Sequence, residues 1–144
     1  MSITQLTGNL MMGVAPGPPA TDISQWVTRL TIQRTREGIT VAGTLATGVA
    51  STVAGAEHDN LIIDFYSDLS ATAPFGLFET AIQTPNAELL FSGSLDPGAV
   101  SATNPKWTGT AIILGVDIGG TVGQLRGQSQ TFPIKGGTLI KAVT

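Results

Sequence analysis

Apolar and polar residues alternate along much of the chain, a pattern typical of β-strands that bury one face. Within residues 22–34, Trp26, Leu30 and Ile32 share one face, and polar residues take the other. A short turn at 35–38 would then lead into an antiparallel partner strand. The same pattern predicts further strands at 39–45, 61–66, 87–93 and 138–143.

The longest extended stretch covers residues 107–134 and has two arms around Gly119-Gly120. Adjacent glycines suit the positive φ angles of a tight turn, so the arms are predicted to pair as one long hairpin. The second arm places Gln124, Arg126 and Gln128 on one polar face. Such a hairpin leaves backbone groups unpaired at its edges, so it requires a larger sheet or neighbouring copies.

One helix is predicted, over residues 74–84. Pro74 suits the first turn of a helix, and Phe75, Phe78 and Ile82 recur at a spacing that places them on one face. Strands lie on both sides of this helix in the sequence. The expected fold is therefore mainly β: a two-sheet β-sandwich or open barrel with one short flanking helix, in a single domain spanning 1–144.

The first 21 residues lack a strand or helix pattern and hold three prolines between residues 13 and 20. Proline favours extended conformations, so residues 1–21 are predicted to form an extended N-terminal arm. A disordered tail is the alternative. In the first interpretation, Leu10, Met11 and Met12 anchor the arm on a neighbouring subunit.

Residues 46–60 form a second unpatterned stretch, made mostly of small residues. Loops of this length without structure of their own are usually functional or disordered. Because the stretch contains Val49, Val53 and several alanines, it is too apolar for a freely solvated loop. We therefore predict a long loop that contacts another subunit or ring.

The composition supports a chain that is covered by other copies. Charged residues are 12% of the chain, against about 25% in ordinary soluble domains, and the net charge is only −3. The seven basic residues are scattered along the sequence and do not form the cluster of positive charge that binds nucleic acid. There is no cysteine, no apolar run of the roughly 18 residues that cross a membrane, and no basic start of a signal peptide. Cytosolic synthesis is expected.

The sequence offers few groups for catalysis. His58 is the only histidine and lies between Glu57 and Asp59 in the predicted loop, so a solvated turn is expected, with a ligand or pH-sensing role as the alternative. Ser129 lacks the strand-to-helix context of a nucleophile elbow. The glycines at 119–123 are not followed by the Gly-Lys-Ser/Thr of a phosphate loop. We predict no enzyme activity, no cofactor and no metal.

Several short runs carry a resemblance to a known family. The runs Asn-Pro-Lys-Trp-Thr-Gly-Thr-Ala at 104–111, Gly-Thr-Val-Gly at 120–123 and Phe-Pro-Ile-Lys-Gly-Gly at 132–137 resemble the C-terminal half of major tail proteins of long, non-contractile-tailed bacteriophages. Residues 22–32 resemble the first long strand of these tail tube proteins, and 61–68 their middle strand. The order and spacing of the runs carry the likeness, and the proline-containing arm departs from it.

The resemblance implies a structural subunit of the virion tail. Six copies would form a homohexameric ring, one sheet of each copy would line a channel, and rings would stack into a tube through which DNA is ejected without sequence-specific binding. Its partners would be itself and the tape measure, tail terminator and distal tail proteins, after synthesis in the host cytoplasm and with no membrane. A head decoration or adhesion β-sandwich is the alternative.

Two sets of residues are assigned to this assembly. The expected inter-subunit contacts are Leu10, Met11, Met12, Val49, Val53, His58 and Trp107. The expected lumen-facing residues are Gln124, Arg126 and Gln128.

Overall fold

The computed structural model describes residues 8–43, 45, 48–67, 69–70, 72–95, 99–118 and 127–144. Their elements are, in order, β1 (Asn9–Val14), β2 (Thr21–Asp22), a 3-10 helix η1 (Ser24–Trp26), β3 (Val27–Val41), β4 (Ser51–Tyr66), α1 (Pro74–Ile82), β5 (Glu88–Ser94), β6 (Lys106–Ile112), β7 (Gly127–Pro133) and β8 (Ile140–Ala142).

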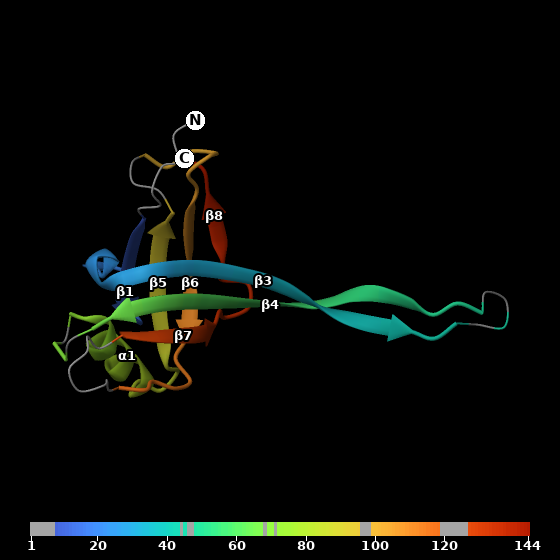
Figure 1. The fold of residues 1–144 in the computed structure, drawn as a ribbon, viewed down its shortest axis with the longest axis horizontal. Helices are drawn as coiled ribbons and strands as arrows, with labels where there is room; N and C mark the ends of the chain where they lie inside the picture. Colours follow the sequence, from blue (N-terminus) through green and yellow to red (C-terminus); the bar gives the residue numbers. More distant parts are fainter. Residues whose placement is uncertain are drawn as a thin grey trace.

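The described strands form two antiparallel sheets. Sheet A has five strands in the order β2-β1-β5-β6-β8, and sheet B has three in the order β3-β4-β7. The strands of sheet B run across those of sheet A (Figure 1). The prediction of a mainly β fold with two sheets and one helix is confirmed.

The core lies between the two sheets, and its largest side chains are phenylalanines. Sheet A contributes Leu10, Met12, Leu89, Phe91 and Ala111, and sheet B contributes Leu61, Ile63, Phe65 and Phe132. Helix α1 adds two more aromatic rings to this core. Phe78 lies edge-on to Phe65 and Phe132, with ring centroids 5.4 and 4.9 Å away. The predicted helix is confirmed, but Ile82 at its end is 39% exposed rather than buried.

The predicted hairpin over 107–134 is wrong. Its first arm is β6, which lies in sheet A between β5 and β8, and its second arm is β7, which pairs with β4 in sheet B. The described parts of the two arms share one isolated bridge, between Ala111 and Ile134. Both arms carry buried residues, and separate sheets let them cover opposite sides of one core. The glycine pair at 119–120 lies outside the described residues.

The N-terminal arm is also corrected, because residues 9–14 form β1 within sheet A. Met12 lies opposite Phe91, and Leu10 lies opposite Gly93 on β5. Leu10 and Met12 are 2% and 0% exposed, so they belong to the core of their own chain and cannot anchor an arm on a neighbour. Their alternation with Met11 is the reason: it places two apolar side chains on one strand face.

The predicted loop at 46–60 is wrong over most of its length, because residues 51–60 are part of β4. This strand pairs with β3 from Val27 opposite Phe65 out to Val41 opposite Ser51. The predicted turn at 35–38 is likewise absent, since β3 continues through it. Together β3 and β4 form a ribbon whose outer part projects from the two sheets (Figure 1).

Candidate functional site

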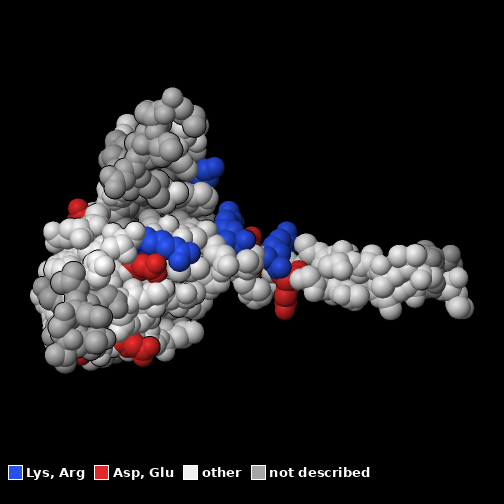
Figure 2. Space-filling view, in the orientation of Figure 1, with Lys and Arg blue, Asp and Glu red and all other residues white. Residues whose placement is uncertain are grey.

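The outer hairpin, defined here as residues 38–43 and 48–56, comprises the outer ends of β3 and β4 and the described residues next to those ends. It projects as a narrow arm whose described surface is free of charged side chains (Figure 2). The whole stretch 38–56 contains no Asp, Glu, Lys, Arg or His. It consists of Gly, Ala, Ser and Thr with a few larger apolar residues. An arm of this composition can be covered by protein without removing a charge from water.

A β-bulge sorts the side chains of the outer hairpin between its two faces. Arg36 lies opposite Glu57 but Gly38 lies opposite Ala54, so β4 carries one extra residue at this point. Beyond the bulge, Ile39 lies opposite Val53. With the register of the body continued unchanged, Ile39 would lie opposite Ala54, and Val53 opposite a threonine. The bulge therefore gathers the large apolar side chains on one face.

The two faces of the outer hairpin differ as a result. One face, the apolar face, carries Ile39, Val41 and Val53, which remain 48%, 47% and 46% exposed. The other carries the opposed pair Thr40 and Thr52 with smaller neighbours. Alternation of this kind is typical of a strand with one face intended for burial, yet no described part of the chain covers the apolar face. This uncovered apolar face is therefore the candidate contact surface of the chain.

A charged collar closes the base of the outer hairpin, where the ribbon leaves the body. It consists of Arg34 and Arg36 on β3 and of Glu57 and Asp59 on β4. Arg34 donates hydrogen bonds from Nε and Nη2 to Glu57 Oε1, the first of them 3.1 Å long, and its Nε lies 3.7 Å from Asp59 Oδ1. Arg36 Nε donates to the carbonyl oxygen of Gly55 at 3.0 Å. These contacts hold the two strands together at the exit point.

The collar also sets the charge state of its two carboxylates. The hydrogen bond from Arg34 lowers the pKa of Glu57. Burial raises the pKa of Asp59, and its hydrogen bond and charge interaction with Glu57 raise it further. The pKa values of Glu57 and Asp59 therefore shift in opposite directions. On the opposite face of the ribbon, His58 Nε2 lies 3.9 Å from Glu37 Oε2, and both side chains are exposed.

The predicted inter-subunit residues other than the buried Leu10 and Met12 fall into three groups. Val49 and Val53 lie on the exposed ribbon, near its tip and on its apolar face, and His58 lies on the ribbon face opposite the collar, so their role as contacts stays a prediction. Met11 is half-buried in β1, beside β2. Trp107 is half-buried in β6, with Lys141 Nζ 5.6 Å from its ring centroid.

Of the three predicted lumen-facing residues, Gln128 is the one that lies within the described part of the chain. Gln124 and Arg126 lie outside the described residues. Gln128 lies opposite Phe65 on β7, on the same side as Phe132, and accepts a hydrogen bond from Gln130 Nε2 at 2.9 Å. This is the side of sheet B that packs on the core. The prediction that Gln128 lies on a polar strand face is wrong, because the strand pairing places it on the same side of β7 as the buried Phe132, and its lumen-facing role stays a prediction.

Sequence reasoning missed that Ile39 and Val41 lie on the same face as Val53, and it missed the collar. A signal was present, since an uncharged run of nineteen residues, 38–56, is flanked on each side by a cluster of charged residues. The register shift that sorts the faces leaves no comparable mark in the sequence.

Within the described part of the chain, no three His, Asp or Glu side chains are placed to hold a metal ion together. No helix among the described residues has the length and apolarity needed to cross a bilayer. No family model matches the chain, and no curated protein matches it.

Proposed function

We propose that this chain is a structural subunit of a phage tail tube, whose copies form hexameric rings that stack through the outer hairpin. The observation that carries the proposal is the apolar face of that hairpin, which extends beyond the body and is half exposed. The family resemblance of the sequence supports the same function, and it supplies the ring stoichiometry.

A two-stranded ribbon is marginally stable in water on its own, so the outer hairpin needs a surface to lie on. Its two arms of six and nine described residues would reach about 20–30 Å from the collar if fully extended, at about 3.3 Å per residue. This is far enough to contact a second molecule of similar size. In the proposed stack the arm contacts a different part of the next copy, so the contact is head-to-tail and can propagate from copy to copy.

Open sheet edges favour assembly with identical neighbours. Among the described strands, β3 and β7 are the edges of sheet B, and β2 and β8 are the edges of sheet A. Exposed edges invite pairing with other chains, and closure of a sheet into a ring removes them. In the proposed ring, neighbouring copies complete these edges. The low charge of the chain fits a subunit largely covered by others.

Passage of DNA requires a channel that does not hold it. Affinity for the phosphate backbone comes from Lys and Arg, and this chain has seven of them against ten acidic residues. Two of the arginines, Arg29 and Arg34, are paired with Asp64 and Glu57. The proposed tube therefore conducts DNA without specific binding.

The test is electron microscopy of the purified chain at high concentration, with a matched variant that lacks the outer hairpin. Because Arg36 and Glu57 lie directly opposite each other, residues 37–56 can be replaced by Asn-Gly, which forms a two-residue hairpin turn. Deleting 46–60 instead would remove Glu57 to Asn60, which pair with β3. The wild type should form rings or hollow tubes, and the variant should keep the circular dichroism spectrum of the body but form no tubes.

Two results would contradict the proposal. A wild-type chain that stays a monodisperse monomer at high concentration, even with tail-assembly proteins added, would remove its basis. Hollow tubes from the shortened variant would remove the role given to the outer hairpin. Binding to phage heads without polymerisation would indicate a decoration protein instead.

A further inference from the structure

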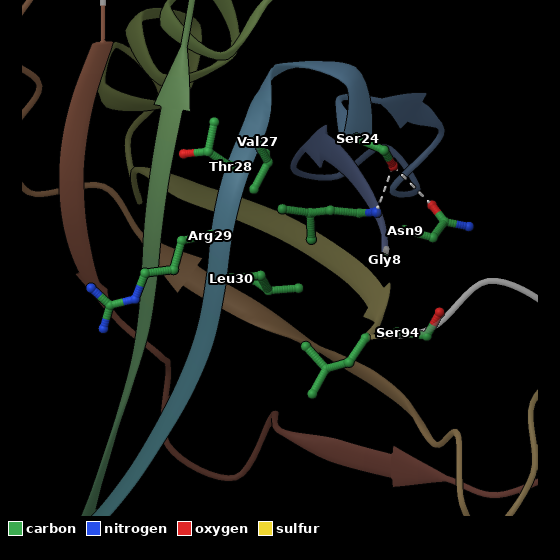
Figure 3. A pocket seen from close by; sticks show the side chains of 10 residues that line it. Gly8, Asn9, Ser24, Val27, Thr28, Arg29, Leu30 and Ser94 are labelled. Atoms are coloured by element: carbon green, nitrogen blue, oxygen red, sulfur yellow. Dashed lines mark hydrogen bonds between the residues drawn. The ribbon is translucent and has the colours of Figure 1, made fainter. Parts of the chain in front are cut away.

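A groove runs along the outer edge of β3, between the two sheets. Two adjoining cavities of about 260 and 330 Å³ form it, and they share Leu30, Ser94 and Leu95. Val27 and Thr28 lie on the wall of the first, and Ile32 and Trp107 on the wall of the second. Figure 3 shows Val27 and Leu30 pointing from β3 toward the groove and the strand end that carries Ser94. The groove thus follows β3 from Val27 to Arg34.

The groove is lined by apolar and uncharged polar side chains, and the two arginines in its lining are paired with carboxylates. Arg29 points away from it, across β4, where its Nη1 lies 3.7 Å from Asp64 Oδ2 (Figure 3). Arg34, at the far end, is engaged by Glu57. The floor includes Gly93, where a Cβ atom would lie 2.8 Å from the carbonyl oxygen of Asn9. An uncharged occupant would therefore be favoured over a charged one.

The wall formed by β3 also offers backbone hydrogen bonds. β3 is the terminal strand of sheet B, and no described strand pairs with its outer edge. An extended segment in the groove could pair with this edge and place alternate side chains against the apolar lining. This is the β-augmentation mode of peptide recognition. It requires an occupant in strand conformation with its own free edge.

We infer that the groove receives the outer hairpin of a second copy of this chain, an inference that rests on the proposed tail tube function. The outer hairpin is already a strand ribbon with free edges, has no charge and carries the apolar face of Ile39, Val41 and Val53. Within one chain, the residues that line the groove belong to the two sheets, and the outer hairpin projects away from these sheets (Figure 1). The hairpin that fills a groove therefore comes from another molecule.

Cysteine cross-linking tests the contact directly, since the natural chain has no cysteine. One preparation carries Leu95→Cys in the groove, and a second, larger tagged preparation carries Ile39→Cys, Val49→Cys or Val53→Cys on the hairpin. The two are mixed under assembly conditions and oxidised. A heterodimer should form with at least one hairpin position. Glu79→Cys, on the exposed side of α1, replaces Leu95→Cys in the control mixture and should give less than a tenth of that product.

A charge-swap measurement keeps the test independent of disulfide geometry. Leu95→Glu should raise the concentration needed for assembly at least tenfold without changing the melting temperature, and adding Val53→Lys in the same chain should restore assembly at least in part. Tubes that form without Leu95→Cys cross-links and without this rescue would refute the groove as the docking site, and would leave the tail tube function intact. A chain that forms no tubes and no cross-links, or one whose hairpin inserts into phosphatidylcholine vesicles instead, would overturn both.

Discussion

The apolar face of the outer hairpin should control assembly without controlling folding. The variant Ile39→Thr/Val53→Thr changes a cross-strand pair on this face and keeps the β-branched shape that strands favour. Both side chains are exposed by nearly half, 48% and 46%, so about half of their apolar surface is left for a partner to bury. Because they contribute little to the core, the free energy of unfolding should change by less than about 0.5 kcal/mol.

The expected effect on assembly follows from that exposed half. Full burial of Val or Ile is worth about 1.5–3 kcal/mol, so the half that remains is worth about 0.7–1.5 kcal/mol for each residue. The pair then contributes about 1.5–3 kcal/mol per hairpin. At about 1.4 kcal/mol for each factor of ten, the contact should weaken by about 10- to 150-fold.

Ultracentrifugal pelleting measures this effect, because the protein left in the supernatant gives the concentration needed for assembly. The matched control is Thr40→Ser/Thr52→Ser, which changes an opposed pair at adjacent positions on the other face. The control should assemble within about twofold of the wild type, since each change removes a single methyl group from the small-residue face. Assembly of Ile39→Thr/Val53→Thr at the wild-type concentration would refute the role of the apolar face. An equally weakened assembly of the control would show that both faces of the hairpin contribute.

Three further predictions concern the body and the collar. Phe78→Ala, at a fully buried ring in the core, should cost about 3–5 kcal/mol of stability in urea denaturation. Glu57→Gln should lower the pKa of Asp59 in a ¹³C NMR titration but leave it above its ordinary value, because burial, its largest cause, remains. Since that pKa is raised by folding, the stabilising contribution of protonated Asp59 is present at low pH and is lost as pH rises through the folded value. Gly137→Ala, at φ +78°, should cost about 1 kcal/mol in thermal denaturation, whereas Gly136→Ala should be nearly neutral.

Local periodicity was sufficient to predict single elements. The alternation of Leu61, Ile63 and Phe65 marks the buried face of β4, and the spacing of Phe75 and Phe78 marks α1. These signals depend on neighbours in the sequence, so they can be read without the fold.

Strand pairing was not predictable in the same way. Whether the arms of 107–134 pair with each other or join separate sheets depends on what else can cover Ile113 and Phe132, and those partners are distant in sequence. β1 was missed because two buried residues, Leu10 and Met12, are too few to establish a period. The outer part of β4 was missed because Ala, Gly and Ser have little strand preference, and its pairing with β3 decides its conformation.

The candidate site was predictable only in part. The sequence indicated that Val49 and Val53 belong to an apolar segment that meets a partner, which stays a prediction. It could not show that a bulge near Gly55 brings Ile39 opposite Val53. A register shift depends on a single extra residue. Because side chains on both strands are of similar size, the sequence carries no signal for the position of that residue.

The charged collar has a consequence for how the ribbon is aligned. Beyond the bulge, threonines, alanines and glycines on the two strands could slide past one another at little cost. Sliding by two residues at the collar, however, would place Asp59 opposite Ile32 in one direction, or Arg34 opposite Leu61 in the other. The ion pairs thus fix the register of the two strands at the base of the ribbon. In a stacked assembly, inserting two residues into each strand beyond the collar would move the tip of the outer hairpin outward by about 7 Å and would lengthen the axial repeat by the same distance.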